Sequence, residues 1–361
     1  MKRFFAKLHL WLSIPFGLVI AIVCVTGVVL VFEDEIKNMN HPERYLADEV
    51  KEEALAPSQI VARAQQMLPD SVTVTGIRMF GEPERNWRLY VDKGWSRCVN
   101  PYTGRITGED TGDEFVRTTT RMHRFLLHSY RYGVDTPWGK LVVGYSTIAF
   151  VFILISGIVI WWPINKKMLK NRLKISTRRG SFRFWYDLHV AGGMYASIFL
   201  LAMALTGLTW SFKWYRTAFY TALGGAPTQS PHGRSRTAEV PAIDYAQWDK
   251  VYAQMSERYP DCKSITLKNG NVSVSTNHYG NIFASDRFAF DPSSGDITKS
   301  DLYADSSRYS KLKGWVWSVH SGQWGGIVTR LLHCIAALLG AVFVLTGYYF
   351  WIRRLMRPRK S

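Results

Sequence analysis

Four long apolar stretches alternate along this chain with polar stretches of domain size. The apolar stretches cover residues 11–32, 138–162, 184–212 and 324–351. Each supplies the roughly 20 residues that a helix needs to cross about 30 Å of hydrocarbon. One such stretch could be a buried helix of a soluble protein, but four in one chain are typical of a membrane protein. The pattern therefore predicts four transmembrane helices.

The first apolar stretch could also be a signal peptide, because basic residues at positions 2, 3 and 7 precede it. It is longer than the apolar region of a signal peptide. The residues that follow it, Phe32 to Glu35, offer no small-residue cleavage site. We therefore expect this stretch to be a retained membrane anchor.

The chain carries a formal net charge of +17, and the basic residues that produce it gather beside the apolar stretches. They lie in the N-terminal segment, in the loop at 163–183, which has no acidic residue, and in the tail at 353–361. Short loops rich in Lys and Arg face the cytoplasm. Both termini are therefore expected in the cytoplasm, with residues 33–137 and 213–323 on the other side. This charge would attract anionic lipid and requires no nucleic-acid partner.

The chain repeats one pattern at an offset of 180 residues. The matching positions of the first and third apolar stretches are Leu8, His9, Thr26, Gly27 and Phe32 against Leu188, His189, Thr206, Gly207 and Phe212. The second and fourth stretches each contain a hydroxyl residue followed by glycine, Ser156-Gly157 in the second and Thr346-Gly347 in the fourth. Self-similarity of this kind predicts a duplicated unit of helix, domain and helix, arranged as parallel repeats. The helices of this division cover 1–32, 138–162, 184–212 and 324–352.

The two polar stretches share an order of predicted elements. Each begins with an amphipathic helix, at 58–68 and 245–259, and continues with strand-like alternation, as at 71–74 and 271–274. Each also contains a turn with Pro and Gly, at 100–104 and 291–295. We therefore expect a small α+β domain in each polar stretch, and a membrane α-helical plus α+β protein as a whole.

The cysteines show no metal-binding or haem-attachment spacing. Cys24, Cys98, Cys262 and Cys334 form no CxxC, CxxCH or zinc pattern, so a covalently attached haem is not expected. Cys98 and Cys262 fall in different polar stretches. A disulfide between them stays open for an oxidising compartment.

Six of the nine histidines cluster at the ends of the apolar stretches: His9, His123, His128, His189, His320 and His333. The other three, His41, His232 and His278, lie in polar sequence and are expected to be solvated surface side chains. Ionisable residues within or beside a membrane span are functional by default. The six clustered histidines are therefore the candidate site residues.

His9 and His189 occupy equivalent positions in the two halves and form the first candidate pair of haem ligands. Each precedes a Thr-Gly pair by 17 and 18 residues, and 18 residues are five helical turns. Imidazole and glycine should therefore share one helix face, where small residues leave room for a flat group or for helix packing. A bis-imidazole iron site needs two facing neutral imidazoles and apolar walls. The alternative is two interfacial histidines bonded to lipid or carbonyl groups.

His9 and His189 are expected near the cytoplasmic face of the membrane. His123 and His320 flank the second and fourth apolar stretches on the extracytoplasmic side, and they form the second candidate pair. His333 is the rival, since it lies about two turns inside the fourth stretch, with Gly340 and Gly347 on its own face. His128 is the weakest candidate, because polar residues follow it.

Together these motifs resemble the PepSY-associated transmembrane family, and within it the inner-membrane ferric-siderophore reductases and iron-regulated membrane proteins. The resemblance covers nearly the whole chain. It rests on Leu8-His9 with Thr26-Gly27, Met122-His123-Arg124, Ser156-Gly157 with Trp161-Trp162-Pro163, residues 187–189 with 205–212, and Val319-His320-Ser321-Gly322 with Leu345-Thr346-Gly347. The family's recurring histidines match His9, His123, His189 and His320, whereas His333 has no match.

The resemblance implies a bacterial inner-membrane protein with two periplasmic PepSY domains and two haems b, one toward each face. It further implies electron transfer to a ferric siderophore or other ferric chelate. No flavin- or nicotinamide-binding motif is present, so a quinol or a cytoplasmic donor must supply the electrons. The alternative is a non-enzymatic, membrane-tethered PepSY module that binds or regulates a periplasmic partner such as a peptidase.

Overall fold

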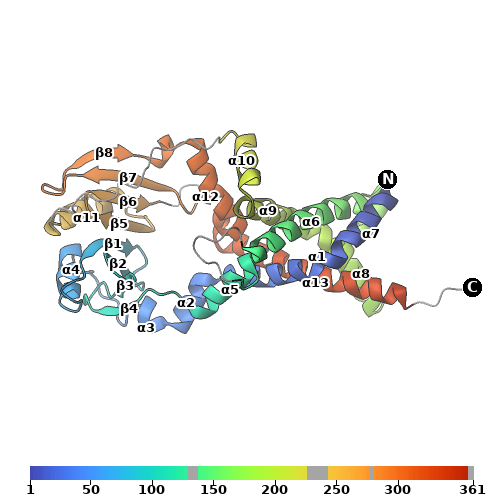
Figure 1. Cartoon of the computed structure of the whole chain (residues 1–361), viewed down its shortest axis with the longest axis horizontal. Coiled ribbons are helices and arrows are strands. Elements are labelled where there is room, and N and C mark those ends of the chain that lie inside the picture. The colour runs from blue at the N-terminus through green and yellow to red at the C-terminus, as the bar shows by residue number, and fades with distance from the viewer. Residues whose placement is uncertain (129–136, 226–242, 277–279, 357–361) are drawn as a thin grey trace, which may run out of the picture. The chain divides into compact units, whose positions relative to one another are not determined.

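The computed structural model describes residues 1–128, 137–225, 243–276 and 280–356, which leaves His232 and His278 outside the described residues. The chain divides into two compact units (Figure 1). A helical unit comprises Met1–Glu33, Phe115–Ala222 and Val316–Ser361, and a sheet unit comprises Asp34–Glu114 and Leu223–Trp315. Each unit is therefore built from segments that are far apart in the sequence.

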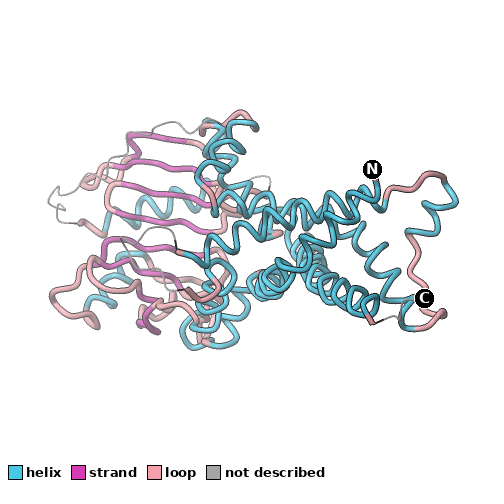
Figure 2. Tube along the Cα trace, turned by 45° about the vertical axis from the view of Figure 1, so that its right-hand side comes forward, coloured by secondary structure: helices cyan, strands magenta, loops and turns pink. Residues whose placement is uncertain are grey.

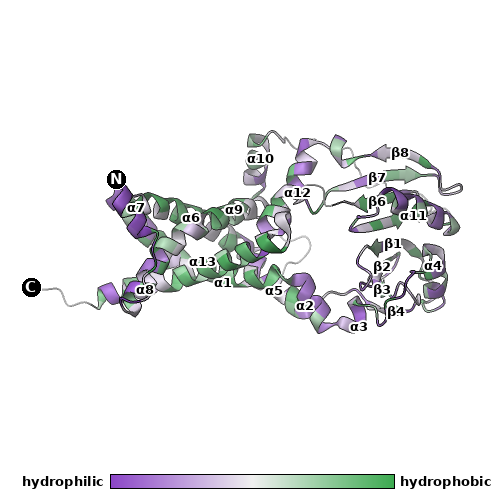
Figure 3. Ribbon diagram, turned by 180° about the vertical axis from the view of Figure 1, so that it is seen from behind, coloured by the Kyte–Doolittle hydropathy of each residue, from purple (hydrophilic) through white to green (hydrophobic). Residues whose placement is uncertain are grey.

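Within its described residues the helical unit contains four stretches long and apolar enough to cross a membrane. They are α1 (Lys2–Leu30), α6 (Trp138–Trp161), α8 (Ser181–Asp187) with η1 (Leu188–Gly192) and α9 (Gly193–Ser211), and η4 (Gln323–Gly325) with α13 (Gly326–Leu355). Figure 3 shows these ribbons as predominantly hydrophobic. The four predicted spans are confirmed, and the protein is a multi-pass membrane protein whose helices contact lipid.

The long helices pack through small residues. α1 contacts α6 and α13, and α9 contacts the same two helices. A Cβ atom on Gly17 would lie 2.7 Å from the Tyr348 hydroxyl oxygen, which donates a hydrogen bond to the Ile14 carbonyl at 2.7 Å. Glycine therefore lets α1 and α13 approach closely, as is common between membrane helices.

Shorter helices flank the spans: α2 (Glu33–Asn40), α3 (Pro42–Tyr45), α5 (Glu114–Phe125), α7 (Lys166–Arg172), α10 (Lys213–Ala222) and α12 (Arg308–Ser321). Of these, α5 and α12 lead into α6 and α13, and α7 lies between α6 and α8. The parts of α5 and α12 that belong to the helical unit bring His123 and His320 to its long helices.

The described residues of the sheet unit form one antiparallel sheet, drawn in magenta in Figure 2. Its eight strands follow the order β4-β3-β2-β1-β5-β6-β7-β8. The strands are β1 (Val74–Phe80), β2 (Trp87–Val91), β3 (Arg97–Val99), β4 (Ile106–Glu109), β5 (Ser264–Lys268), β6 (Asn271–Ser275), β7 (Ser285–Phe290) and β8 (Ile297–Asp301). Each polar stretch of the sequence contributes four of them. The two sets join where β1 pairs with β5, from Gly76 opposite Lys268 to Phe80 opposite Ser264.

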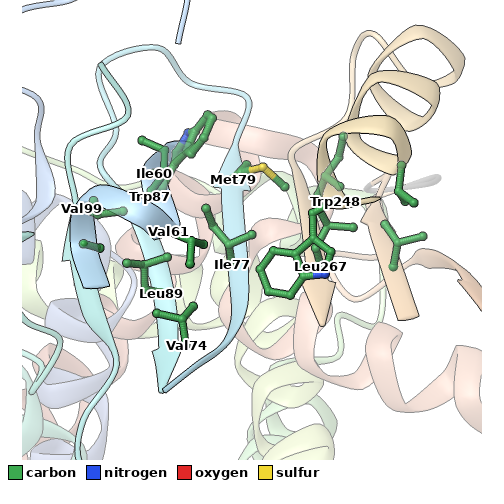
Figure 4. Close-up of a cluster of buried hydrophobic side chains, with 14 of the residues drawn as sticks. Ile60, Val61, Val74, Ile77, Met79, Trp87, Leu89, Val99, Trp248 and Leu267 are labelled. Carbon is green, nitrogen blue, oxygen red and sulfur yellow. The ribbon is translucent and has the colours of Figure 1, made fainter. Parts of the chain in front are cut away.

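The helices α4 (Pro57–Gln65) and α11 (Ala246–Arg258) cover one face of this sheet and share one hydrophobic core with it (Figure 4). Ile77, Leu267 and Trp248 are buried in this core. The Asp249 carboxylate of α11 accepts hydrogen bonds from the Ser58 backbone N–H of α4 at 2.8 Å and from the Ser58 hydroxyl at 2.5 Å. The two polar stretches therefore fold around common interior contacts.

Several local predictions can be compared with these elements. The two amphipathic helices and the strand at 271–274 are confirmed by α4, α11 and β6. The strand predicted at 71–74 is wrong in position, because β1 begins at Val74 and the Thr73 N–H donates to the Asp92 carboxylate. Both predicted turns end in glycines with positive φ, Gly104 at 71° and Gly295 at 70°.

The disulfide between Cys98 and Cys262 is not formed, since all four cysteines are free. Cys98 lies on β3 and Cys262 just before β5, three strand positions apart in the sheet. Three strand spacings are about 14 Å, whereas Cα atoms of a disulfide lie about 4.4–6.8 Å apart. The sheet order therefore keeps these thiols from pairing.

Candidate functional site

The helical unit brings four histidines together in two pairs. The ring centres of His9 and His189, the first pair, lie 6.5 Å apart, and those of His123 and His320, the second pair, lie 6.3 Å apart. Two imidazoles that bind one metal ion from opposite sides, through bonds of about 2 Å, have ring centres about 6.4 Å apart. The separations also fit an edge-to-face ring contact, so the surroundings of each ring decide between these arrangements.

Each histidine of the two pairs lies on a different helical segment. His9 lies on α1 and His189 in the π-helical turn η1, whereas His123 lies on α5 and His320 on α12. π-Helical turns within α-helices are frequent at functional sites. The π-helical turn therefore supports a functional role for the position of His189.

A hydroxyl group from another helix meets the Nδ1 atom of each ring. The contacts are His9 with Ser156 at 3.2 Å, His123 with Thr26 at 3.0 Å, His189 with Thr346 at 2.8 Å and His320 with Thr206 at 3.1 Å. Each hydroxyl also donates to a backbone carbonyl of its own helix: Ser156 to Ile153, Thr26 to Ile22, Thr346 to Val342 and Thr206 to Ala202. Because each hydroxyl donates its own proton to a carbonyl, it accepts a hydrogen bond from the imidazole N–H.

Backbone carbonyls reinforce this arrangement at three of the rings. Nδ1 lies 3.0 Å from the Ile153 carbonyl at His9, 3.0 Å from the Val23 carbonyl at His123 and 2.9 Å from the Met203 carbonyl at His320. A carbonyl oxygen can only accept, so Nδ1 carries the proton and Nε2 keeps its lone pair. This is the tautomer that a metal-ligating histidine adopts when its second nitrogen is held by a neighbouring group.

The glycine after each of these hydroxyl residues makes room for the same ring. Cβ atoms built on the glycines would approach the imidazole Cε1 atoms at 3.4 Å for Gly157 and His9, 3.4 Å for Gly27 and His123, 3.1 Å for Gly207 and His320, and 3.9 Å for Gly347 and His189. Gly27 therefore does not make room for His9, the histidine of its own helix. The two residues are about 27 Å apart along α1 at 1.5 Å per residue, so they lie at opposite ends of the helix.

The first pair lines a cavity of about 850 Å³ in the helical unit. This volume lies within the roughly 300–1,000 Å³ of cofactor and ligand sites. The cavity walls combine apolar side chains with five glycines, Gly17, Gly157, Gly193, Gly340 and Gly347. The space beside His9 and His189 is therefore wide and largely apolar, as a flat organic cofactor requires.

One end of this cavity is cationic. Its lining includes Lys167, Arg172, Arg183 and Arg354, against one carboxylate, Asp187, whose oxygen lies 2.9 Å from the Arg183 guanidinium. Arg172 also donates to the Ile160 carbonyl at 3.0 Å. The remaining positive charge favours the anionic groups of a ligand at this end of the cavity.

The second pair is held in its neutral form. Burial lowers the pKa of His123 to about 4 and the pKa of His320 to about 3, so both imidazoles are uncharged at neutral pH. The Trp210 ring lies against His320, with ring centres 5.0 Å apart. Neutral imidazoles beside apolar rings suit metal ligation.

The other candidate histidines are placed differently. His333 is 1 % exposed, and its Nδ1 lies 2.8 Å from the Thr329 carbonyl of its own helix. Its ring packs on Phe199, with centres 5.4 Å apart, and its Nε2 has no hydrogen-bond partner among the described residues. His128 is exposed. His41 is half-buried, so it is partly solvated as expected, and its Nε2 lies 3.3 Å from the Asp113 carboxylate.

Larger ligand clusters do not occur in the part of the chain that the structure describes, because no three His, Cys, Asp or Glu side chains converge there on a metal position. Each candidate site therefore offers two protein ligands. Two axial imidazoles are a ligand set typical of haem iron, since the porphyrin supplies the other donors.

Comparisons with known proteins add one finding to this geometry. The family model described as the PepSY-associated TM region matches residues 6–354. The matched range includes the four histidines of the two pairs. It also includes the Ser or Thr residue that contacts each ring and the glycine that follows it. A search of curated proteins finds no match for the chain.

Proposed function

The chain belongs to the PepSY-associated transmembrane family, and on that basis we propose that it is a b-type haem protein that transfers electrons across a bacterial inner membrane to ferric siderophores or other ferric chelates. One observation carries the proposal. Two histidine pairs stand at separations that fit a shared metal ion, and each ring has its Nδ1 bound to a neighbouring helix and its Nε2 without a hydrogen bond among the described residues.

The residues at the first pair fit a haem. His9 and His189 would bind the haem iron, and the cavity that they line, with its glycines and cationic side chains, would hold the haem. His123 and His320 would hold a second haem in the same manner. Bound haem supplies reversible exchange of one electron between Fe(III) and Fe(II). The protein holds the imidazoles neutral, orients them and excludes water.

The direction of transfer follows from the charge of the loops. Basic residues at the N-terminus, at 163–183 and in the C-terminal tail favour a cytoplasmic location for these segments, so the sheet unit would lie in the periplasm. We interpret the sheet unit as two PepSY domains that arose with the rest of the chain by duplication. The succession of one helix and four antiparallel strands in each polar stretch supports this interpretation.

The reaction balances with a quinol as the donor. One quinol loses two electrons and two protons, and two Fe(III) ions each gain one electron. A different cytoplasmic donor would supply the same electrons. Fe(II) is less charged than Fe(III) and binds oxygen ligands more weakly, so reduction releases iron from the chelate.

The test is a haem measurement on the purified full chain. We expect about two haems b per chain and a reduced-minus-oxidised difference spectrum after addition of dithionite. Membranes supplied with a quinol should then reduce an added ferric chelate. A colourless protein that takes up no haem when haem is added would contradict the proposal and favour a tethered binding module.

A further inference from the structure

The face of the sheet opposite α4 and α11 carries a band of cations and aromatic rings. Strand register assigns residues to this face: Arg88 pairs with Arg78, Arg78 with Thr266, Thr266 with Ser273, and Ser273 with Arg287. Partners across antiparallel strands share a face, and alternate residues of each strand point to the other side. Neighbouring Ile77 and Leu267 accordingly lie in the core beneath the helices.

Arg78 is the centre of this band. It is half-buried, and its Nε atom donates to the Ser264 hydroxyl at 3.2 Å. Its guanidinium lies 5.0 Å from the centre of the Phe80 ring, and the Arg85 guanidinium lies 4.0 Å from the same ring. Two guanidinium groups are thus held on one aromatic side chain, which limits their freedom before any ligand binds.

The charge of Arg78 is not balanced by a carboxylate among the described residues. Arg85 pairs with Glu82 at 3.3 Å and Arg88 with Asp110 at 2.7 Å, but no carboxylate forms an ion pair with Arg78. Burial lowers the pKa of Arg78; the nearby Tyr90 hydroxyl raises this pKa, and Arg88 and Arg85 lower it. Arginine nevertheless stays charged in proteins, so a partly buried cation among other cations would be stabilised by an external anion.

A second cation and ring lie in the adjacent row of the same face. Gly76 stands between Tyr90 of β2 and Lys268 of β5. A Cβ atom on Gly76 would lie 2.9 Å from the Lys268 side chain and 3.2 Å from the Tyr90 ring, so only glycine leaves these side chains in contact. The Lys268 amine then lies 4.6 Å from the centre of the Tyr90 ring.

We propose that this face, centred on Arg78 and flanked by Lys268, binds an anionic ferric chelate whose donor groups are aromatic, such as a catecholate complex. The inference rests on the proposed function and names its substrate class. Cations bind the negative charge of such a complex, and the Phe80 and Tyr90 rings contact its aromatic donors. Among the residues that strand pairing aligns with Arg78, the acidic one is Asp301. It pairs with Arg287 and lies on the edge strand β8.

The test uses the Ga(III) complex of 2,3-dihydroxybenzoate, because Ga(III) accepts no electron and its binding is independent of haem. Titration of the purified full chain by calorimetry gives the affinity. We expect Arg78→Gln and Lys268→Gln each to weaken binding about tenfold, as expected for one charge-assisted hydrogen bond. Added salt should weaken binding by the wild type. A cationic Ga(III) hydroxamate complex should bind less tightly than the anionic complex.

The matched control is Lys250→Gln. Lys250 lies on α11, on the covered side of the sheet, where it pairs with Asp296 at 2.7 Å. Its replacement should leave the affinity unchanged. Arg78→Lys keeps the positive charge but lacks the planar guanidinium group, so it should bind with intermediate affinity. That result would show that the weaker binding of Arg78→Gln comes from the lost charge and not from misfolding. Equal affinity in wild type and Arg78→Gln, or no binding by wild type, would overturn the inference.

Haem content measured on the same preparations separates the two proposals. A haem-containing chain that does not bind the Ga(III) complex would refute the docking face and leave the electron-transfer function standing. A haem-free chain that binds the complex through Arg78 would refute electron transfer and leave the docking face standing.

Discussion

The Thr346 hydroxyl lies 2.8 Å from Nδ1 of His189 and donates its own proton to the Val342 carbonyl at 2.9 Å. Thr346 can therefore only accept a hydrogen bond from His189, which leaves the lone pair of this ring on Nε2. The other three rings have a backbone carbonyl near Nδ1 in addition to a hydroxyl. Within the described residues, His189 has the hydroxyl without such a carbonyl.

This difference predicts a large effect of Thr346→Val. The substitution keeps the shape of the side chain and removes the acceptor, so His189 loses its orientation. We expect haem affinity at the first site to fall about 10–100-fold, the usual cost of losing such a supporting contact. The rate of haem transfer to added apomyoglobin measures this loss.

Two variants serve as comparisons for Thr346→Val. Thr206→Val should lose less haem, because the Met203 carbonyl still holds His320. Thr147→Val should lose none, because the Thr147 hydroxyl bonds only to the Val143 carbonyl of its own helix among the described residues. Equal haem retention by Thr346→Val and Thr147→Val would show that the hydroxyl does not support the site.

The pairing of the histidines predicts which double substitutions are additive. His9→Ala and His189→Ala should each reduce haem from about two to about one per chain, and the double variant should lose no more. His9→Ala combined with His320→Ala should remove both haems, because these residues belong to different pairs. A haem assay on purified variants measures this. Additive loss within one pair would disprove the shared ligation.

Glycine contacts predict unequal effects of two otherwise similar substitutions. An alanine Cβ at position 207 would lie 3.1 Å from His320, which is too close without movement of the ring, whereas at position 347 it would lie 3.9 Å from His189, an ordinary contact. Gly207→Ala should therefore lower haem content at the second site, and Gly347→Ala should not. Haem per chain and the reduced spectrum distinguish them. The reverse order would exclude the steric argument.

Sequence periodicity predicts much of the helical unit because a membrane span must be long and apolar. The 180-residue repeat also relates His9 to His189, and the positions of His123 and His320 beside the second and fourth apolar stretches suggest the second pair; the structure brings both pairs together. The sequence does not reveal which glycine serves which ring. That depends on how α1 packs against α5 and α6, and residues that share a helix face can still lie at opposite ends of the helix.

The sheet shows a second limit of prediction from sequence. Alternation indicates strands such as β6, but it does not name their partners, since every strand offers the same backbone groups on both sides. The pairing of β1 with β5 joins residues more than 180 positions apart. Periodicity also places the start of β1 too early. The Thr73 N–H donates to the Asp92 carboxylate, and the strand begins at Val74.

The charge distribution predicts the side of the membrane on which the sheet unit lies. Ser293→Cys and Glu52→Cys place exposed thiols in the two polar stretches. A membrane-impermeant maleimide should label both in intact spheroplasts, in a chain whose half-buried Cys262 is replaced by Ser. Labelling that requires lysis would overturn the orientation. A cysteine at exposed Lys167 provides the opposite control, since it should react only after lysis.

His333 is the remaining rival for the second haem, but no second imidazole faces its ring among the described residues, whereas His123 and His320 face each other. The ring is buried against Phe199, its Nδ1 bonds to its own helix, and its Nε2 is unpartnered among the described residues. A buried nitrogen without a partner costs about 1–3 kcal/mol. His333→Leu removes that nitrogen and fills the same space, so we expect full haem content and an unchanged or higher thermal midpoint. His320→Ala should instead lose the second haem and keep the first. If His333→Leu strips one haem while His320→Ala keeps both, the ligand lies within α13 and the second pair is not the haem site.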